Sequence, residues 1–391
     1  MEVEADAAAG EVQDVLRAVA RPRRVGSAGA AEVGADLRRR LTALGYEVRV
    51  LPFSFSDWPG RFGVPVAGAA HLAGSFVAGT LLREGWPGTA LLVLVLVAAI
   101  DVALALTAPM AMRRLGVGRV EGENLIAARP GARPRWIVMA HRDSKSQPIP
   151  TALRGAALAA AAGSWLVLVA IALVALLGPV PVGAVLLAGS VGVVGGALML
   201  FSWVGDTSPG ALDNASGIAT LMAVAARQNP EANDVAFVIT DGEEMGLCGA
   251  RSLATRLPPI SGVINIDGID DEGPFHIVER FGRPRRGLAP HLAAPLLSAA
   301  AALNHSMCRR DAPFGILLDH MPLVDAGLPA LTLMRGRARS LLRVHTPADD
   351  LTRLRGTGAA EAAELVSLAL AGLRRAEPSG DERVAHGGVR G

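Results

Sequence analysis

The chain has 391 residues, of which 51% are hydrophobic and 19% are charged. This apolar content is high for a soluble protein and indicates membrane-spanning segments. The formal net charge is only +2, so the sequence shows no footprint of nucleic-acid binding and no nucleic-acid partner is expected. The two cysteines, Cys248 and Cys308, are too few for a disulfide framework or a cysteine-rich zinc cluster.

The first part of the chain is predicted to belong to an α/β domain. Residues 8–45 form an amphipathic helical region, because Leu37, Leu41 and Leu44 recur at helical spacings among charged residues. The alternating stretch 46–51 is expected to be a strand.

Residues 61–112 change in character and are predicted to form a first transmembrane hairpin. The moderately apolar stretch 64–82 and the almost wholly apolar stretch 89–110 are joined by a polar turn at 83–88, and the second is long enough to cross a bilayer. Asp101 lies inside this second span. An intramembrane carboxylate indicates a functional site, but pairing within the helix bundle, for example with His71, is the interpretation we favour.

Residues 113–150 return to soluble patterning, with short apolar strands expected at 124–128 and 136–140. Residues 151–205 then hold a second apolar pair, 155–177 and 180–204, which is predicted to form a second transmembrane hairpin. Gly192 and Gly196 lie four residues apart in the latter span and provide a small-residue face for close helix packing.

Residues 206–377 alternate between strands and helices. Helices are expected at 216–227, 246–256, 289–303 and 357–375, and strands at 235–240, 262–267, 306–309 and 329–334. This alternation predicts an α/β fold with a mixed, mostly parallel sheet sandwiched by helices and interrupted by the two hairpins. The polar, glycine-rich tail 378–391 is expected to be disordered.

Five polar segments follow or end the predicted strands, or lie in loops near them. They are His141-Arg-Asp-Ser144, Asp213-Asn214, Glu243-Glu244, Asn265-Ile-Asp267 and His345-Thr-Pro-Ala-Asp-Asp350. Histidine and carboxylate side chains are the ligands that zinc takes when thiols are absent. Strand-end loops are also where open sheets place their sites, so the segments predict one metal-binding site.

In this order the five segments resemble the motifs of the two-zinc aminopeptidases of metallopeptidase family twenty-eight. Its relatives include bacterial leucyl aminopeptidases, glutamate carboxypeptidases and glutaminyl cyclases. The resemblance covers roughly 8–54, 120–146 and 206–375, but neither apolar hairpin. It implies a peptidase domain built from 1–60, 113–150 and 206–377.

The resemblance implies two zinc ions per chain. His141 and Asp267 would bind one ion, Glu244 and His345 would bind the other, and Asp213 would bridge both.

The resemblance also implies catalytic roles for residues beside these ligands. Glu243 would act as the general base, and Asp143 would orient the metal-binding imidazole of His141. His320, in a segment near the family's substrate pocket, would donate to the substrate or the tetrahedral intermediate. A structural loop histidine is an equally good interpretation of His320.

These features predict a membrane-anchored zinc aminopeptidase that hydrolyses N-terminal peptide bonds. A glutaminyl-cyclase-like acyltransferase, which would need one zinc, is an alternative, and a non-catalytic membrane scaffold is another. A transporter is disfavoured because the four spans are split as two hairpins inside an enzyme-like domain. Because the second hairpin starts close after His141, we also expect the active-site mouth to lie near the membrane surface, unless the hairpins are mere anchors.

The expected location is the bacterial cell membrane, with about four spans, and the expected partners are a peptide substrate and the lipid bilayer. The sequence gives no oligomeric state. Because Arg113, Arg114, Arg119, Lys145 and Arg154 flank the spans on the domain side, the positive-inside rule places the domain in the cytoplasm. A reporter enzyme fused after Gly391 should therefore be active only inside the cell, and activity confined to the outside would contradict this topology.

Overall fold

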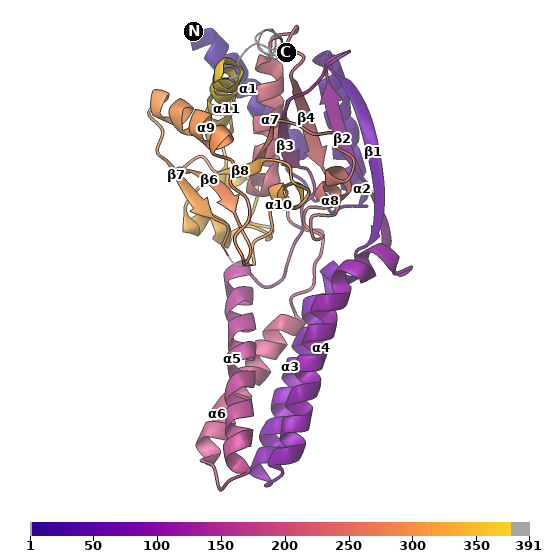
Figure 1. Cartoon of the computed structure of the whole chain (residues 1–391), viewed down its shortest axis with the longest axis vertical. Helices are drawn as coiled ribbons and strands as arrows, with labels where there is room; N and C mark the ends of the chain where they lie inside the picture. The colour runs from indigo at the N-terminus through magenta and orange to yellow at the C-terminus, as the bar shows by residue number, and fades with distance from the viewer. Residues whose placement is uncertain (1, 314, 377–391) are drawn as a thin grey trace, which may run out of the picture.

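The computed structural model describes residues 2–313 and 315–376. An α/β domain sits at one end of a long four-helix bundle (Figure 1). The expected disordered tail, 378–391, lies outside the described residues.

An eight-stranded sheet forms the centre of the α/β domain, in the order β1-β2-β4-β3-β5-β8-β6-β7. The four central strands, β4, β3, β5 and β8, run parallel, whereas β1, β2 and β6 each have antiparallel neighbours. The strands are β1 (Glu47–Ser56), β2 (Arg119–Ala128), β3 (Trp136–His141), β4 (Val235–Thr240), β5 (Gly262–Ile269), β6 (Phe275–Arg280), β7 (Met307–Asp311) and β8 (Ala330–Arg335).

Helices cover both faces of the sheet. On β4, Phe237 and Ile239 pack with helices α1, α2, α7, α9 and α11, whereas Ala236 and Val238 pack with α8 and α10. This alternation follows from the two-residue period of a strand buried on both sides. The predicted fold class is thus confirmed. The helices are α1 (Glu2–Val19), α2 (Ala28–Ala43), α7 (Ser216–Arg227), α8 (Cys248–Ala254), α9 (Pro290–Ala302), α10 (His320–Asp325) and α11 (Thr357–Ala376).

Two local features differ from the expected elements. The helical region 8–45 consists of two helices separated by a loop, and the second helix starts at a cap in which Ser27 accepts a hydrogen bond from the Ala30 N–H. Strand β6 was not expected, because its short apolar set is split between two faces: Phe275 and Ile277 pack into the main core and Val278 packs into a smaller cluster, among polar residues.

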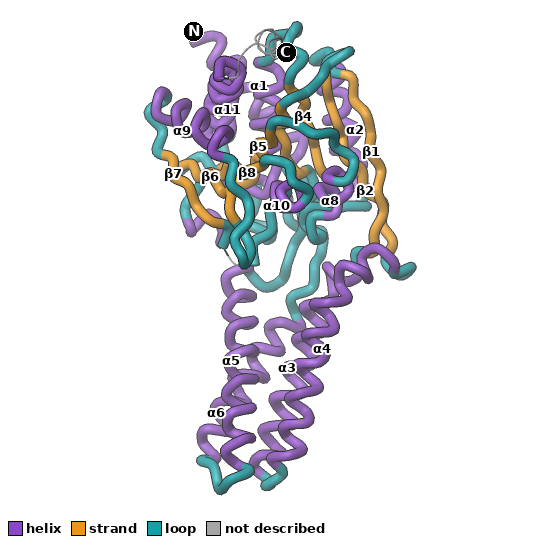
Figure 2. Tube along the Cα trace, viewed as in Figure 1, coloured by secondary structure: helices purple, strands orange, loops and turns teal. Residues whose placement is uncertain are grey.

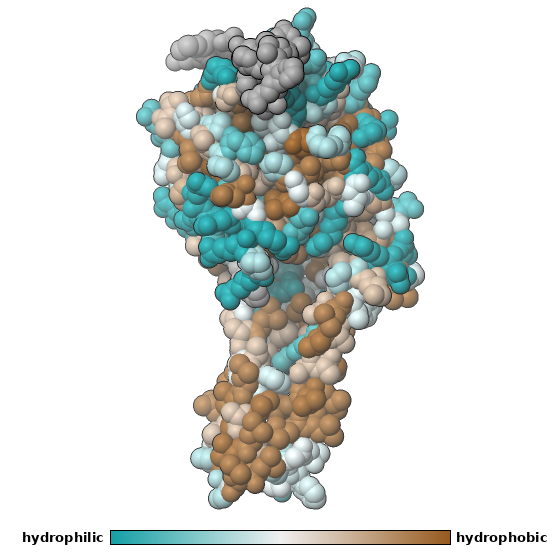
Figure 3. Space-filling model, viewed as in Figure 1, coloured by the Kyte–Doolittle hydropathy of each residue, from teal (hydrophilic) through white to brown (hydrophobic). Residues whose placement is uncertain are grey.

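Four helices form the bundle, and each is long and apolar enough to cross a membrane. They are α3 (Trp58–Arg83), α4 (Pro87–Arg114), α5 (Thr151–Ala175) and α6 (Val182–Leu200). Apolar side chains dominate the visible face of the bundle (Figure 3), and Phe76 and Leu106 are 66% and 74% exposed. The bundle therefore has the surface expected of transmembrane helices.

Small residues allow α3 and α6 to approach closely. A Cβ atom added at Gly196 would lie 2.4 Å from the backbone nitrogen of Leu72, and one added at Gly68 would lie 2.3 Å from that of Leu200. In the same bundle, Nε2 of His71 lies 2.8 Å from an oxygen of Asp101. Asp101 is therefore paired within the bundle, as the sequence interpretation favoured.

The carboxyl ends of the parallel strands face the bundle. Strand β3 ends at His141 and the chain enters α5 at Thr151, so this end of the sheet must point toward the bundle. Strands β4, β5 and β8 share the direction of β3, so their following loops gather at the same edge, between sheet and bundle (Figure 2).

The close approach of α3 and α6 makes Gly196→Leu destabilising. A leucine there must push the two helices apart, which should lower stability by about 1–3 kcal/mol. Gly163→Leu is the matched control, because a Cβ atom at Gly163 of α5 meets nothing within 4 Å. Thermal unfolding of both variants in detergent checks this, and equal unfolding temperatures would contradict the packing.

Candidate metal centre

One group of candidate metal ligands forms around His141, the last residue of β3. Nε2 of His141 lies 3.2 Å from Oδ1 of Asp213 and 3.6 Å from Oδ1 of Asp267. His141 is fully buried, and Asp267, on β5, is 6% exposed. The three side chains offer ligand atoms that all lie within 4.8 Å of one another, so they could hold one metal ion.

A second group shares Asp213 with the first. Nε2 of His345 lies 3.2 Å from Oδ2 of Asp213 and 3.2 Å from Oε2 of Glu244. These atoms also lie within 4.8 Å of one another. The two carboxylate oxygens of Asp213 thus face different groups, as a carboxylate that bridges two metal ions must.

Buried polar atoms without partners show that these groups fit a metal. Among the described residues, Nε2 of His141, Nε2 of His345 and Oε1 of Glu244 are buried and form no hydrogen bond. Leaving such atoms unsatisfied is costly, and a cation would satisfy all three. Nitrogen and carboxylate donors without thiols match the preferences of zinc.

Backbone hydrogen bonds to Asp349 hold Asp213 in place. The N–H groups of Leu212 and Asp213 donate to the two oxygens of Asp349, at 2.8 Å and 3.1 Å. Asp213 lies in the distorted turn η1 (Ala211–Ala215), where its backbone is not helical. Because Asp349 follows His345 in the chain, one loop supplies both a ligand and the support for the shared carboxylate.

Asp143 contacts the ligands in a different way from the one expected. The ring nitrogen Nδ1 of His141 contacts the backbone carbonyl of Asp143 at 3.1 Å, and the carboxylate lies farther away, at 3.6 Å. That carboxylate accepts hydrogen bonds from the N–H groups of Glu243 and Glu244, both at 3.1 Å. Asp143 therefore positions His141 through its backbone and the glutamate pair through its side chain.

The two adjacent glutamates lie in different electrostatic environments. Burial raises the pKa of Glu243 well above its ordinary value, and neighbouring carboxylates add to the effect. Burial would also raise the pKa of Glu244, but His345 and Lys145 lower it overall. Neither ligand group includes Glu243. The arrangement suits a proton acceptor at Glu243 and an ionised ligand at Glu244.

Lys145 was not among the residues predicted for the site. Its Nζ lies 2.6 Å from Oε2 of Glu244, and its side chain is 17% exposed. It is the only lysine in the sequence and follows directly after His141-Arg-Asp-Ser144. Its position next to this motif was the one feature of the sequence that could have pointed to it. The contact with Glu244 itself could not be predicted, because the two residues lie about a hundred positions apart in the chain.

Asp319 and His320 lie in the buried interior near the site. His320 is fully buried; its Nδ1 contacts Oγ1 of Thr332 at 2.7 Å, and burial lowers its pKa to about 4. It belongs to neither ligand group, so its role as a donor to substrate stays a prediction. Burial raises the pKa of Asp319 to about 7. The sequence analysis assigned a role to the neighbouring His320 but none to Asp319.

The first residue of α5 contacts a candidate ligand. Oγ1 of Thr151 lies 3.3 Å from Nδ1 of His345, and the N–H of Gln147 donates to the His345 carbonyl at 2.8 Å. Hydrogen bonds to the second ring nitrogen fix the orientation of metal-binding histidines. The bundle therefore helps to position His345.

The sheet and the two ligand groups at its edge define an α/β fold of the metallopeptidase type. The model of peptidase family M28 matches residues 190–370, which contain all the predicted ligands except His141. No curated protein matches the sequence. The family match and the solved structures described next confirm the resemblance that the motifs indicate.

Solved structures of both peptidases and cyclases share the fold. Porphyromonas gingivalis glutaminyl cyclase superposes with a TM-score of 0.56 at 17% identity, covering 94% of this chain and 98% of that one. An aminopeptidase from Aneurinibacillus sp. strain AM-1 has a TM-score of 0.54 at 14% identity, covering 93% of each chain. Fimbriiglobus ruber glutaminyl cyclase has a TM-score of 0.54 at 18% identity, covering 93% and 94%.

The shared position of Asp213 predicts unequal effects of ligand substitutions. Asp213→Ala should weaken metal binding at both groups, and by more than the roughly 10–100-fold loss typical of an outer-sphere partner. Asp267→Ala should weaken only the group around His141. Elemental analysis after dialysis against graded chelator concentrations checks this. Equal metal loss from the two variants would show that Asp213 is not shared.

Proposed function

We propose that the protein is a membrane-embedded, zinc-dependent peptidase, and specifically an aminopeptidase. The observation that carries the proposal is the pair of ligand groups, one largely buried and the other partly buried, that share Asp213, with Glu243 beside them. The proposal includes a peptide substrate, two zinc ions per chain and a cytoplasmic location of the α/β domain.

The proposed ligands would be His141 and Asp267 for one zinc and Glu244 and His345 for the other, with Asp213 contacting both. When bound, two zinc ions polarise the scissile carbonyl and acidify the attacking water.

Glu243 supplies the proton transfers. Its buried carboxylate, with its raised pKa, takes a proton from the attacking water and passes it to the leaving amine. Asp143 holds the backbone of Glu243 through a hydrogen bond, so the carboxylate is placed before the substrate arrives.

The position of the site supports a membrane-associated substrate. The ligands lie at the sheet edge that faces the bundle, and Thr151 joins the start of α5 to His345. If the four apolar helices span a bilayer, the site lies close to the membrane surface. Peptides held at that surface would reach it by lateral diffusion.

A glutaminyl cyclase is the second candidate. The folds of the glutaminyl cyclases described above favour it. Against it, His141, Asp213 and Asp267 form a ligand group in addition to the one that contains Glu244 and His345, whereas the cyclase reaction implied by the resemblance needs one zinc. A scaffold without activity would have no need of this donor set.

Two measurements separate the candidates. Two zinc ions per chain favour the peptidase, one favours the cyclase, and none favours the scaffold. Release of a chromogenic group from amino-acid anilides, abolished by a chelator and restored by zinc, would support the peptidase. Cyclisation of N-terminal glutaminyl peptides without anilide hydrolysis would replace the proposal with the cyclase.

Glu243→Gln should retain metal and lose activity. Removal of a general base costs typically 10²–10⁴-fold in rate, and the amide cannot accept the proton. Glu231→Gln is the matched control, because Glu231 is exposed and remote from the ligand groups. Near-normal anilide hydrolysis by metal-replete Glu243→Gln protein would contradict the assigned role.

A further inference from the structure

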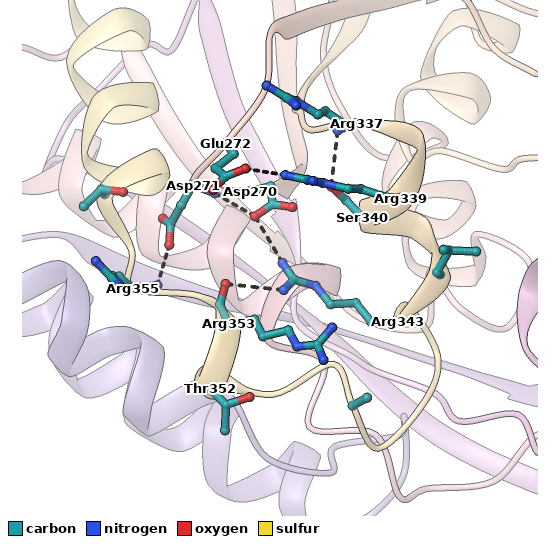
Figure 4. A pocket seen from close by; sticks show the side chains of 13 residues that line it. Asp270, Asp271, Glu272, Arg337, Arg339, Ser340, Arg343, Thr352, Arg353 and Arg355 are labelled. Carbon is teal, nitrogen blue, oxygen red and sulfur yellow. Dashed lines mark hydrogen bonds and ion pairs between the residues drawn. The ribbon is translucent and has the colours of Figure 1, made fainter.

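A cavity of about 790 Å³ lies beside the metal centre and includes none of its proposed ligands. One wall is the loop after β5, which carries Asp270, Asp271 and Glu272. The other walls come from the segment 337–357, which includes the short turns η2 (Ala338–Leu342) and η3 (Leu351–Arg353). Figure 4 shows acidic side chains on one side of this space and arginines around the rest.

The lining of the cavity is basic, with five arginines and three carboxylates. The carboxylates all have donors of their own. Glu272 pairs with Arg339 at 2.5 Å and Asp270 with Arg343 at 3.1 Å. Asp271 accepts hydrogen bonds from backbone N–H groups, including that of Gly358 at 2.9 Å. The acidic side of the cavity therefore needs no added cation.

Two of the arginines have guanidinium groups that are not paired with a carboxylate in the described part of the chain. Arg353 and Arg355 are exposed, and neither side chain forms an ion pair within the described part of the chain. The Arg353 carbonyl accepts from Arg343, and the Arg355 N–H donates to Asp271, so the backbone of both residues is fixed while both guanidinium groups stay free. Free guanidinium groups on a fixed backbone suit an anion, and phosphate above all.

The rim of the cavity lies where the bilayer surface is expected. Turn η2 contacts α5, the first helix of the second hairpin. Leu341 and Leu342 on η2 are 45% and 59% exposed, and Arg339 and Arg343 flank them in sequence. Exposed leucines between arginines are typical of segments that lie at a membrane interface.

These observations favour a lipid over a free anion. Inorganic phosphate would engage the arginines and leave Leu341 and Leu342 in water, whereas a phospholipid offers both a phosphate and acyl chains. We propose that this cavity binds the headgroup of an anionic phospholipid from the bilayer leaflet next to the domain. The inference rests on the proposed membrane embedding of α5, but it requires no peptidase activity.

The same segment carries His345, two residues after Arg343. A headgroup bound between η2 and η3 would hold this loop against the bilayer from one side, while Thr151 contacts His345 from α5. The lipid would therefore act on the candidate metal centre through the loop that supplies one of its ligands.

Competition binding with the full chain in detergent tests the proposal. Fluorescent phosphatidylglycerol should bind, unlabelled phosphatidylglycerol should displace it, and phosphatidylcholine at the same concentration should not. Arg353→Gln/Arg355→Gln should weaken binding roughly 30-fold, because each basic residue at an anionic surface contributes a factor of about five. The backbone contacts of both residues survive these substitutions, so the fold should be retained.

Two further variants make the test specific. Arg38→Gln/Arg49→Gln changes the net charge equally at two exposed positions on α2 and β1, away from the cavity, and should bind like wild type. Leu341→Ser/Leu342→Ser should weaken phosphatidylglycerol binding without changing competition by inorganic phosphate.

Three outcomes would overturn the proposal. They are equal displacement by both lipids, equal losses in the cavity and control variants, or displacement by inorganic phosphate as effective as that by phosphatidylglycerol. Anilide hydrolysis measured on the same samples keeps the two proposals apart. Selective lipid binding without hydrolysis would contradict the peptidase alone, and hydrolysis without lipid selectivity would contradict the headgroup site alone.

Discussion

The gathering of carboxylates at one buried sheet edge is the constraint on which the rest of this structure depends. Asp213 belongs to both ligand groups, so its carboxylate lies close to that of Glu244 on one side and to that of Asp267 on the other. Such a cluster is unfavourable without positive charge. Two histidines and Lys145 supply part of the compensation, and the backbone donors to Asp143 and Asp349 fix the loops that carry the ligands. A metal ion held by the two ligand groups would complete the balance of charge.

The sequence predicted those features that have a local or periodic signature. Apolar runs of bilayer length identified four helices, and alternation between strands and helices identified the parallel centre of the sheet. The ligand segments could be grouped because parallel strands bring their carboxyl ends to one edge. Contacts between residues far apart in the chain could not be predicted from the sequence. The ion pair of Lys145 with Glu244 and the support of Asp213 by Asp349 join residues about a hundred or more positions apart. Strand β6 is short and its apolar residues lie on both faces of the sheet, so its sequence shows no clear alternation.

The hairpins connect to the α/β domain close to the candidate metal centre. The second hairpin leaves the sheet only ten residues after His141, and both return to the side of the domain that holds the candidate centre. The cavity between η2 and η3 shares its wall with the loop of His345. If the bundle spans a bilayer, the membrane surface, the basic cavity and the ligand loop would form one continuous region, in which a change at the lipid surface would reach the ligands through a few contacts.

The contact between Thr151 and His345 could transmit a movement of α5 to a candidate metal ligand. A transmembrane helix adjusts its tilt when the hydrocarbon thickness around it changes. Thr151 is the first residue of α5, so a change of tilt moves its hydroxyl relative to the imidazole. With α5 in a bilayer, the orientation of one candidate ligand would depend on the thickness and lateral pressure of the membrane, and the same chain could differ in metal affinity between two lipid environments.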